Sequence, residues 1–242
     1  MEKGTGHKQQ HGYSIINQNS VNAAWNGQPT TLQVSQNISI PQMPNGTAIL
    51  AATNQTTQNN QGQLSITSGG GQPSFLNLQA NANQPSIVIQ NWNSNNLSLT
   101  NISPNNNTPV LVQVAGPGMP GVTPLSLPIG GSGVQLTQGQ VAQGNASPQW
   151  MQLVIQSTAA TLGIIGLIGG PTDASGNNGY VIAVNATQNS GPNTGVTPPP
   201  GYYATTTSNS YAYTLNWGSS LVWVGNFSPS TAQPVTIILR AL

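Results

Sequence analysis

Charged residues are what this sequence has least of. Of its 242 residues, 2% are charged, whereas an average soluble domain has about 25%. The charged residues are Glu2, Lys3, Lys8, Asp173 and Arg240. Residues 12–172 and 174–239 therefore contain no Asp, Glu, Lys, Arg, His or Cys. The formal net charge of +1 is close to zero, a condition that favours association between copies over mutual repulsion.

The lack of basic residues excludes one large class of partner. Binding to nucleic acid or to an anionic membrane surface depends on clustered Lys and Arg that release counterions, and no such cluster is present. No apolar run reaches the length of a membrane-spanning helix. The nearest candidate, residues 162–170, has about half that length.

Cysteine is absent, so disulfides, thiolate ligands and iron–sulfur clusters are excluded. The polar N-terminal residues 1–11 lack the apolar core of a secretory signal. We therefore expect that the chain is mature from Met1, or that it leaves the cell by lysis or by a route without a signal. An extracellular or surface location (cell, spore or virion) is the expected setting.

Titratable side chains for catalysis are almost missing. Outside the first eleven residues, acid–base chemistry could use only Asp173, Arg240 and tyrosines, whereas general acid–base catalysis needs a positioned titratable group. His7 and His11 have the spacing of a helical metal-ligand pair but lack a third ligand. We predict that the protein is not an enzyme and has no cofactor and no metal.

Two further features have competing interpretations. The glycine-spaced residues 163–170 lack the Lys and Ser of a phosphate-binding loop, so they predict either a buried strand with close backbone contacts or a membrane-inserting hairpin of a pore-former. Asp173 follows Pro171 and Thr172 and fits a turn. Its alternatives are a structural ion pair with Arg240 and, less favoured, a calcium site.

Short apolar runs with period-two alternation are what the sequence does have, and turns rich in Gly, Pro and Asn separate them. This pattern predicts an all-β fold of the β-sandwich or jelly-roll type. One elaborated sandwich and two stacked sandwiches remain open. The expected organisation is an extended N-terminal arm (1–30), a first sandwich region (31–116), a Gly/Pro-rich linker (117–133) and a second sandwich region (134–242).

Two details refine this prediction. Residues 221–224 and 235–239 are almost wholly apolar, as in central strands covered on both faces. A weak sequence similarity links residues 86–90 with residues 152–156 and would fit two related sandwiches.

The arm and a few aromatic residues are the candidate contact sites. Tyr13, Ile15, Ile16 and Trp25 are isolated apolar residues in a polar segment, which either stays disordered or adds a strand to a partner's sheet edge. Trp223 is expected in the core.

Tyr202, Tyr203 and Trp217 lie beside expected loops, where aromatic rings can bind glycans. The Asn-x-Ser/Thr sequons of this Asn-rich chain, which include Asn54, Asn101 and Asn226, carry little weight.

These observations favour a structural subunit that assembles with itself into a filament, appendage, fibre or coat. Soluble monomers usually protect the edges of their sheets with charged side chains, especially Lys. This chain has almost no charged residues, so its edges lack that protection. The alternatives are a carbohydrate-binding sandwich of lectin or tail-fibre type and a pore-forming β protein. Amyloid is disfavoured, because 19 prolines and 28 glycines divide the chain into turns.

Overall fold

The structure is a computed structural model that describes thirteen segments of the chain: residues 22–24, 27–42, 47–56, 59–79, 85–91, 96–145, 150–157, 163–172, 178–187, 190–194, 203–207, 210–216 and 221–242. These residues form twenty β-strands and no helix. The predicted all-β sandwich is confirmed.

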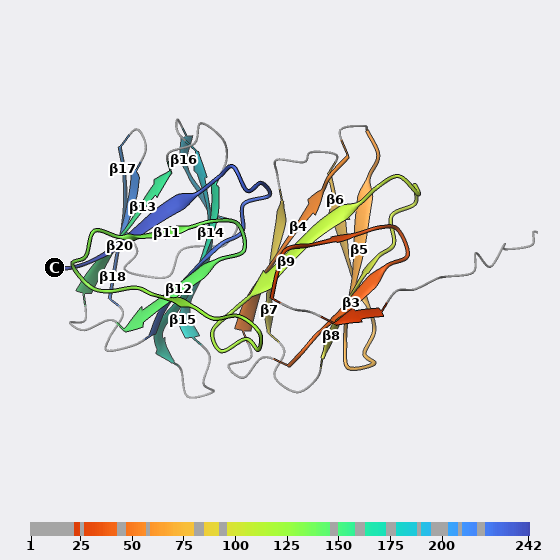
Figure 1. The fold of residues 1–242 in the computed structure, drawn as a ribbon, viewed down its shortest axis with the longest axis horizontal. Helices are drawn as coiled ribbons and strands as arrows, with labels where there is room; N and C mark the ends of the chain where they lie inside the picture. Colours follow the sequence, from red (N-terminus) through yellow and green to blue (C-terminus); the bar gives the residue numbers. More distant parts are fainter. Residues whose placement is uncertain are drawn as a thin grey trace, which may run out of the picture.

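The strands form four sheets, which we name A to D and which stack in that order (Figure 1). In order across the sheet, sheet A contains β1 (Asn22–Ala24), β3 (Asn37–Ile40), β8 (Leu97–Asn101), β5 (Gly62–Ser68) and β6 (Ser74–Leu78). Sheet B contains β2 (Thr30–Leu32), β9 (Val110–Ala115), β4 (Thr47–Asn54) and β7 (Ser86–Asn91).

The second half of the chain forms the other two sheets. Sheet C contains β10 (Leu125–Ser126), β12 (Val141–Asn145), β19 (Leu221–Asn226), β14 (Gly163–Thr172), β15 (Asn178–Thr187) and β16 (Ser190–Thr194). Sheet D contains β11 (Val134–Leu136), β20 (Val235–Ala241), β13 (Trp150–Ser157), β18 (Ser210–Asn216) and β17 (Tyr203–Thr207). Within the expected linker 117–133, residues 125–126 form β10, which pairs with β12.

Alternation along the strands produces two hydrophobic cores. In β8, Leu97 and Leu99 are fully buried while Ser98 and Thr100 are part-exposed, because successive side chains point to opposite faces of a sheet. Leu97 and Leu99 belong to the core between sheets A and B. Leu153 of β13 belongs to a second core between sheets C and D.

The central strands β9 of sheet B and β19 of sheet C are covered on both faces. Every residue of β9 is buried, and so are residues 222–226 of β19. The prediction that residues 221–224 form a doubly covered strand is therefore confirmed. Residues 235–239 lie in β20 of the outermost sheet D, where Val235, Ile237, Ile238 and Leu239 are buried and Thr236 is part-exposed.

The two halves of the chain repeat one topology. The sheet order β1-β3-β8-β5-β6 of sheet A recurs as β10-β12-β19-β14-β15 in sheet C. The order β2-β9-β4-β7 of sheet B recurs as β11-β20-β13-β18 in sheet D. Both β1 and β10 pair in parallel with their neighbours. We name residues 22–115 repeat 1 and residues 125–241 repeat 2; β16 and β17 are additions to repeat 2.

The register of the strands is also repeated. Leu64 stands opposite Asn101 in the β5–β8 pair, and Ile165 stands opposite Asn226 in the β14–β19 pair. The similarity between residues 86–90 and 152–156 is therefore misleading. It joins β7 to β13, whereas the strand equivalent to β13 is β4.

A buried asparagine ties three segments of repeat 1 together. The side-chain amide of Asn101 donates to the carbonyl oxygens of Leu32, at 2.8 Å, and Thr108, at 2.9 Å. Its Oδ1 accepts from the backbone N–H of Ser103, at 3.0 Å, and from the Ser103 hydroxyl, at 2.6 Å. We call this set of four hydrogen bonds the asparagine clip.

Repeat 2 contains the same clip. Asn226 donates to the carbonyls of Leu136 and Gln233, both at 3.0 Å, and accepts from the backbone and hydroxyl of Ser228. Both asparagines open the sequence Asn-x-Ser-Pro-x-x-x-(Thr/Gln)-Pro-Val, at residues 101–110 and 226–235. Asn101 and Asn226 are at most 1% exposed, so these two sequons are structural hydrogen-bonding sites in the folded chain.

We predict that Asn101→Ala and Asn226→Ala each lower the free energy of unfolding by about 2–4 kcal/mol, because each change leaves several buried polar groups without a partner. Asn107→Ala, in an exposed turn, is the control and should change it by less than about 0.5 kcal/mol. Urea denaturation followed by tryptophan fluorescence measures the difference. Equal small effects of all three substitutions would contradict a structural role of the clip.

Candidate functional site

Most of the residues singled out from the sequence lie outside the described residues. This holds for His7, His11, Tyr13, Ile15, Ile16, Trp25, Asp173, Tyr202 and Trp217. The docked-arm, ion-pair and glycan-site predictions made with them therefore stay predictions. Tyr203 begins β17, at the edge of sheet D. From the predicted arm, residues 22–24 form β1, which pairs with β3 of the same chain.

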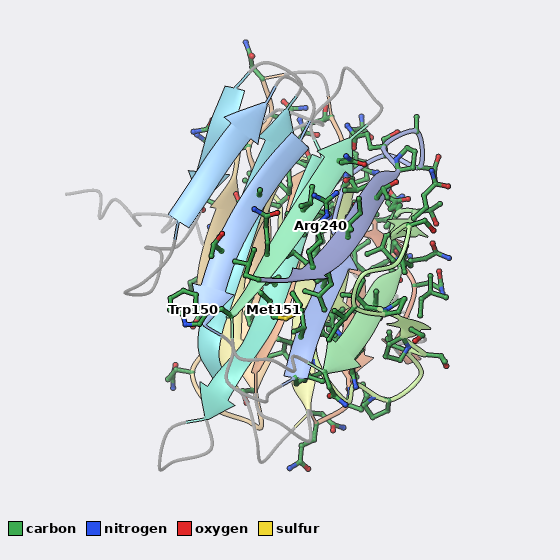
Figure 2. The ribbon with its side chains drawn as sticks, turned by 90° about the vertical axis from the view of Figure 1, so that its left-hand side faces the viewer. Trp150, Met151 and Arg240 are labelled. Carbon is green, nitrogen blue, oxygen red and sulfur yellow. The ribbon has the colours of Figure 1, made fainter. Side chains whose placement is uncertain are left out.

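The outer side of sheet D is one of the two end faces of the molecule, and Figure 2 looks onto it. Met151, Leu153 and Ile155 point into the core, so the alternate residues of β13 point outward. We name as the D face the outward residues Trp150, Gln152, Val154, Gln156, Thr236, Ile238 and Arg240. Arg240 is exposed and stands opposite Gln152 across the β13–β20 pair (Figure 2).

Trp150 is an exposed aromatic side chain of this face. It is 42% exposed, whereas Trp223 of β19 is fully buried, as the sequence predicted. The alternation of Trp150 with Met151 and Leu153 is the signal that sets Trp150 on the outer side. The contact residues predicted from the sequence are instead Tyr202, Tyr203 and Trp217.

The outer side of sheet A is the opposite end of the stack (Figure 1). We name as the A face its outward residues Asn37, Ser39, Gln63, Ser65, Thr67, Phe75, Asn77, Ser98 and Thr100. These are hydroxyl and amide side chains apart from Phe75, which is 60% exposed. Gln63 Nε2 donates to Asn77 Oδ1 across the β5–β6 pair at 2.9 Å. The A face therefore carries no charge.

Between these ends, the outer side of sheet B packs directly on the outer side of sheet C. A Cβ atom added to Gly166 of β14 would lie 2.5 Å from Ile49 Cδ1 and 2.6 Å from Phe227 Cε2, so glycine is what allows the two sheets to approach here. Phe227 packs on Trp223, with ring centroids 6.3 Å apart. Both belong to the hydrophobic core of repeat 1 although they come from repeat 2.

Hydrogen bonds also cross this interface between the repeats. Gln113 of β9 is buried and its Nε2 donates to the carbonyls of Phe227, at 2.9 Å, and Ser228, at 3.1 Å. Ser228 belongs to the asparagine clip of repeat 2. The clip therefore positions both the end of β19 and the backbone that Gln113 binds.

Sheets A and C are equivalent, so their outer faces can be compared position by position. The strand registers equate Ser65 with Gly166, Thr100 with Gly225, Ser98 with Trp223 and Asn37 with Val141. The face that docks inside the chain has apolar or glycine residues at these positions. The A face has small polar residues there, which are compatible with solvent and with a wet protein contact.

A groove of about 270 Å³ lies beside the junction of the two repeats. Its lining is Gly27, Gln28, Gly121, Val122, Thr123, Leu125, Gly139, Gln140 and Val141. None of these side chains titrates, so the groove offers no acid or base for catalysis. Within the described residues, no group of three His, Cys, Asp or Glu residues could hold a metal ion.

The glycine-spaced segment forms β14, between β19 and β15 in sheet C. Ile165 and Leu167 are buried in the core between sheets C and D, as one of the two interpretations of this segment expected. The described part of the chain has no helix that is long and apolar enough to span a membrane.

Comparisons with known proteins give little. No protein-family model matches the chain, and no curated protein matches its sequence. Among solved structures, the crystal structure of the PBSX exported protein XepA aligns over 86% of this chain and 84% of its own, at 10% identity and a TM-score of 0.26. A superposition at this score gives no basis for transferring a fold or a function.

We predict that Gly166→Ala lowers the free energy of unfolding by about 1–3 kcal/mol, because the added methyl group overpacks the contact between sheets B and C. Ser65→Ala, at the equivalent position on the A face, is the matched control and should change it by less than about 0.5 kcal/mol. Thermal unfolding by calorimetry compares the two variants. Similar effects at both positions would contradict the tight packing at Gly166.

Proposed function

We propose that the protein is a non-enzymatic structural subunit that assembles with itself into an extracellular filament, appendage, fibre or coat. The observation that carries the proposal is the chemistry of the two end faces. Among the described outward residues of sheets A and D, Arg240 is the only charged one. Contact between copies through these faces would therefore meet almost no charge repulsion and almost no cost of desolvating ions.

An unprotected sheet edge supports the same proposal. Strand β6 is the outermost strand of sheet A, and its sequence Ser-Phe-Leu-Asn-Leu contains neither charge nor proline. Phe75 of this strand is the most exposed aromatic residue of the described chain. Soluble monomers usually block such edges with Lys, Pro or bulges, so β6 is a second surface on which copies could meet.

We predict that the purified chain forms long polymers that persist between about pH 5 and pH 9 and between about 0.05 and 1 M NaCl. The physical reason is that almost no group in the contact can titrate or be screened. Electron microscopy and light scattering measure the polymers. A monodisperse monomer at micromolar concentration would contradict the proposed function.

Binding of neutral glycans is the second candidate function, and Trp150 favours it. An exposed tryptophan with the amide of Gln152 two residues along the same side of β13 has the composition of a carbohydrate platform, with an apolar ring next to a hydrogen-bonding group. Tyr202, Tyr203 and Trp217 are the candidates predicted from the sequence for this role, and Trp150 adds a candidate on the D face.

If glycan binding is the function, Trp150→Ala should lower the affinity for a glycan found on an array by about tenfold or more, since stacking of a sugar on the ring would be lost. Trp223→Phe is the control, because the buried Trp223 does not face solvent, and it should leave the affinity unchanged. An array without hits for the wild-type protein would reject this candidate.

A further inference from the structure

We propose that copies of this chain stack head to tail, with the D face of one copy packed on the A face of the next. This inference rests on the proposed structural function and names the surfaces that would perform it. Each contact would repeat, between chains, the packing that already joins sheet B to sheet C inside the chain.

Two kinds of sheet alternate along the stack. Sheets A and C are equivalent, and so are sheets B and D. We call sheets A and C the first type and sheets B and D the second type, so the two types alternate along the stack A, B, C, D (Figure 1). Its central contact joins the outer side of a second-type sheet to the outer side of a first-type sheet. The surfaces left at the two ends, the D face and the A face, are the same pair of types.

Such a contact is heterologous, because it joins two different surfaces. A heterologous contact leaves one unused surface of each kind at the ends of every assembly. Repetition gives a ring if the rotation between copies closes and an open fibre if it does not. In Figure 1 sheets A and D lie at opposite ends of the stack of sheets. Copies added at these ends would therefore extend the stack.

The side chains on the A face allow close approach of a second sheet. At its centre, Ser65 and Thr100 stand opposite each other in the β5–β8 pair. They occupy the positions of Gly166, which admits Ile49 of sheet B, and of Gly225, which lies against Trp223 and Phe227 of its own repeat. The small side chains of Ser and Thr fill a little of that space and add hydroxyl groups for hydrogen bonds.

The D face has a matching composition. Val154 and Ile238 are opposite each other in the β13–β20 pair and form a small apolar centre, where they are 5% and 8% exposed in the single chain. Around them, Gln152, Gln156 and Thr236 offer neutral donors and acceptors. Neutral hydroxyl and amide groups can pair with those of the A face without the cost of removing an ion from water.

Two double variants test the pairing of faces. Ser65→Lys/Thr100→Lys places two charges at the centre of the A face and leaves the D face intact. Gln152→Lys/Thr236→Lys places two charges beside the apolar centre of the D face and leaves the A face intact. Gln72→Lys/Asn106→Lys adds the same charge in exposed turns and is the matched control. Circular dichroism and thermal unfolding establish that each variant folds.

The expected result is specific to head-to-tail stacking. Each face variant alone should be monomeric by analytical ultracentrifugation, with a critical concentration for polymer raised about 100-fold or more, because unpaired charges would be buried. An equimolar mixture of the two should form a one-to-one dimer that does not grow, since only one intact D face and one intact A face can meet. The control should polymerise like the wild type.

The remaining outcomes separate this inference from the proposed function. Face variants that polymerise like the wild type would overturn the stacking and leave self-assembly standing; loss of polymer on deletion of residues 1–21 would then assign assembly to the N-terminal arm. A mixture that stays monomeric, or one in which polymers form again, would overturn the pairing of the D face with the A face. A wild-type chain that is monomeric at every concentration would reject both.

Discussion

The contact between sheets B and C is the constraint on which the rest of the structure depends. A β-sheet that is covered on both sides must have side chains on both sides that tolerate burial, and this explains why no residue of β9 reaches solvent. The contact also requires a close approach, which Gly166 provides opposite Ile49. Because it joins unlike sheets of the two repeats, it determines which surfaces are left at the ends of the stack.

Much of the fold could be predicted from the sequence, because alternation of apolar and polar residues reports directly on which face of a strand is buried. The all-β class followed from runs such as Leu97-Ser-Leu99, and the buried Trp223 followed from its apolar neighbours. Alternation within one strand does not report what lies beyond its sheet. The apolar run at residues 235–239 predicts a strand covered on both faces. It lies in the outermost sheet, where its outward Ile238 is buried and its outward Thr236 is part-exposed.

The repeat was harder to predict because the sequences of its equivalent strands differ, while the segments after β8 and β19 share one pattern. The sequence similarity first noticed, between residues 86–90 and 152–156, joins strands that are not equivalent, since short apolar runs recur by chance in any β protein. The signal that was missed lies after β8 and β19, where Asn-x-Ser-Pro-x-x-x-(Thr/Gln)-Pro-Val occurs twice. Hydrogen bonds of fixed geometry constrain the identity of Asn101 and Asn226, whereas packing constrains only size and polarity.

The contact inside the chain is apolar, whereas the A face carries mainly neutral polar side chains. The internal contact buries Trp223, whereas the equivalent position of the A face has Ser98. Apolar burial makes the internal contact obligatory for folding, while hydroxyl and amide faces gain less from association and keep their hydrogen bonds to water until a partner arrives. If copies stack as proposed, the chain would fold as a finished unit first, and copies would then meet through weaker contacts that repeat from one subunit to the next. The near absence of charge would keep charge repulsion from opposing that weak contact.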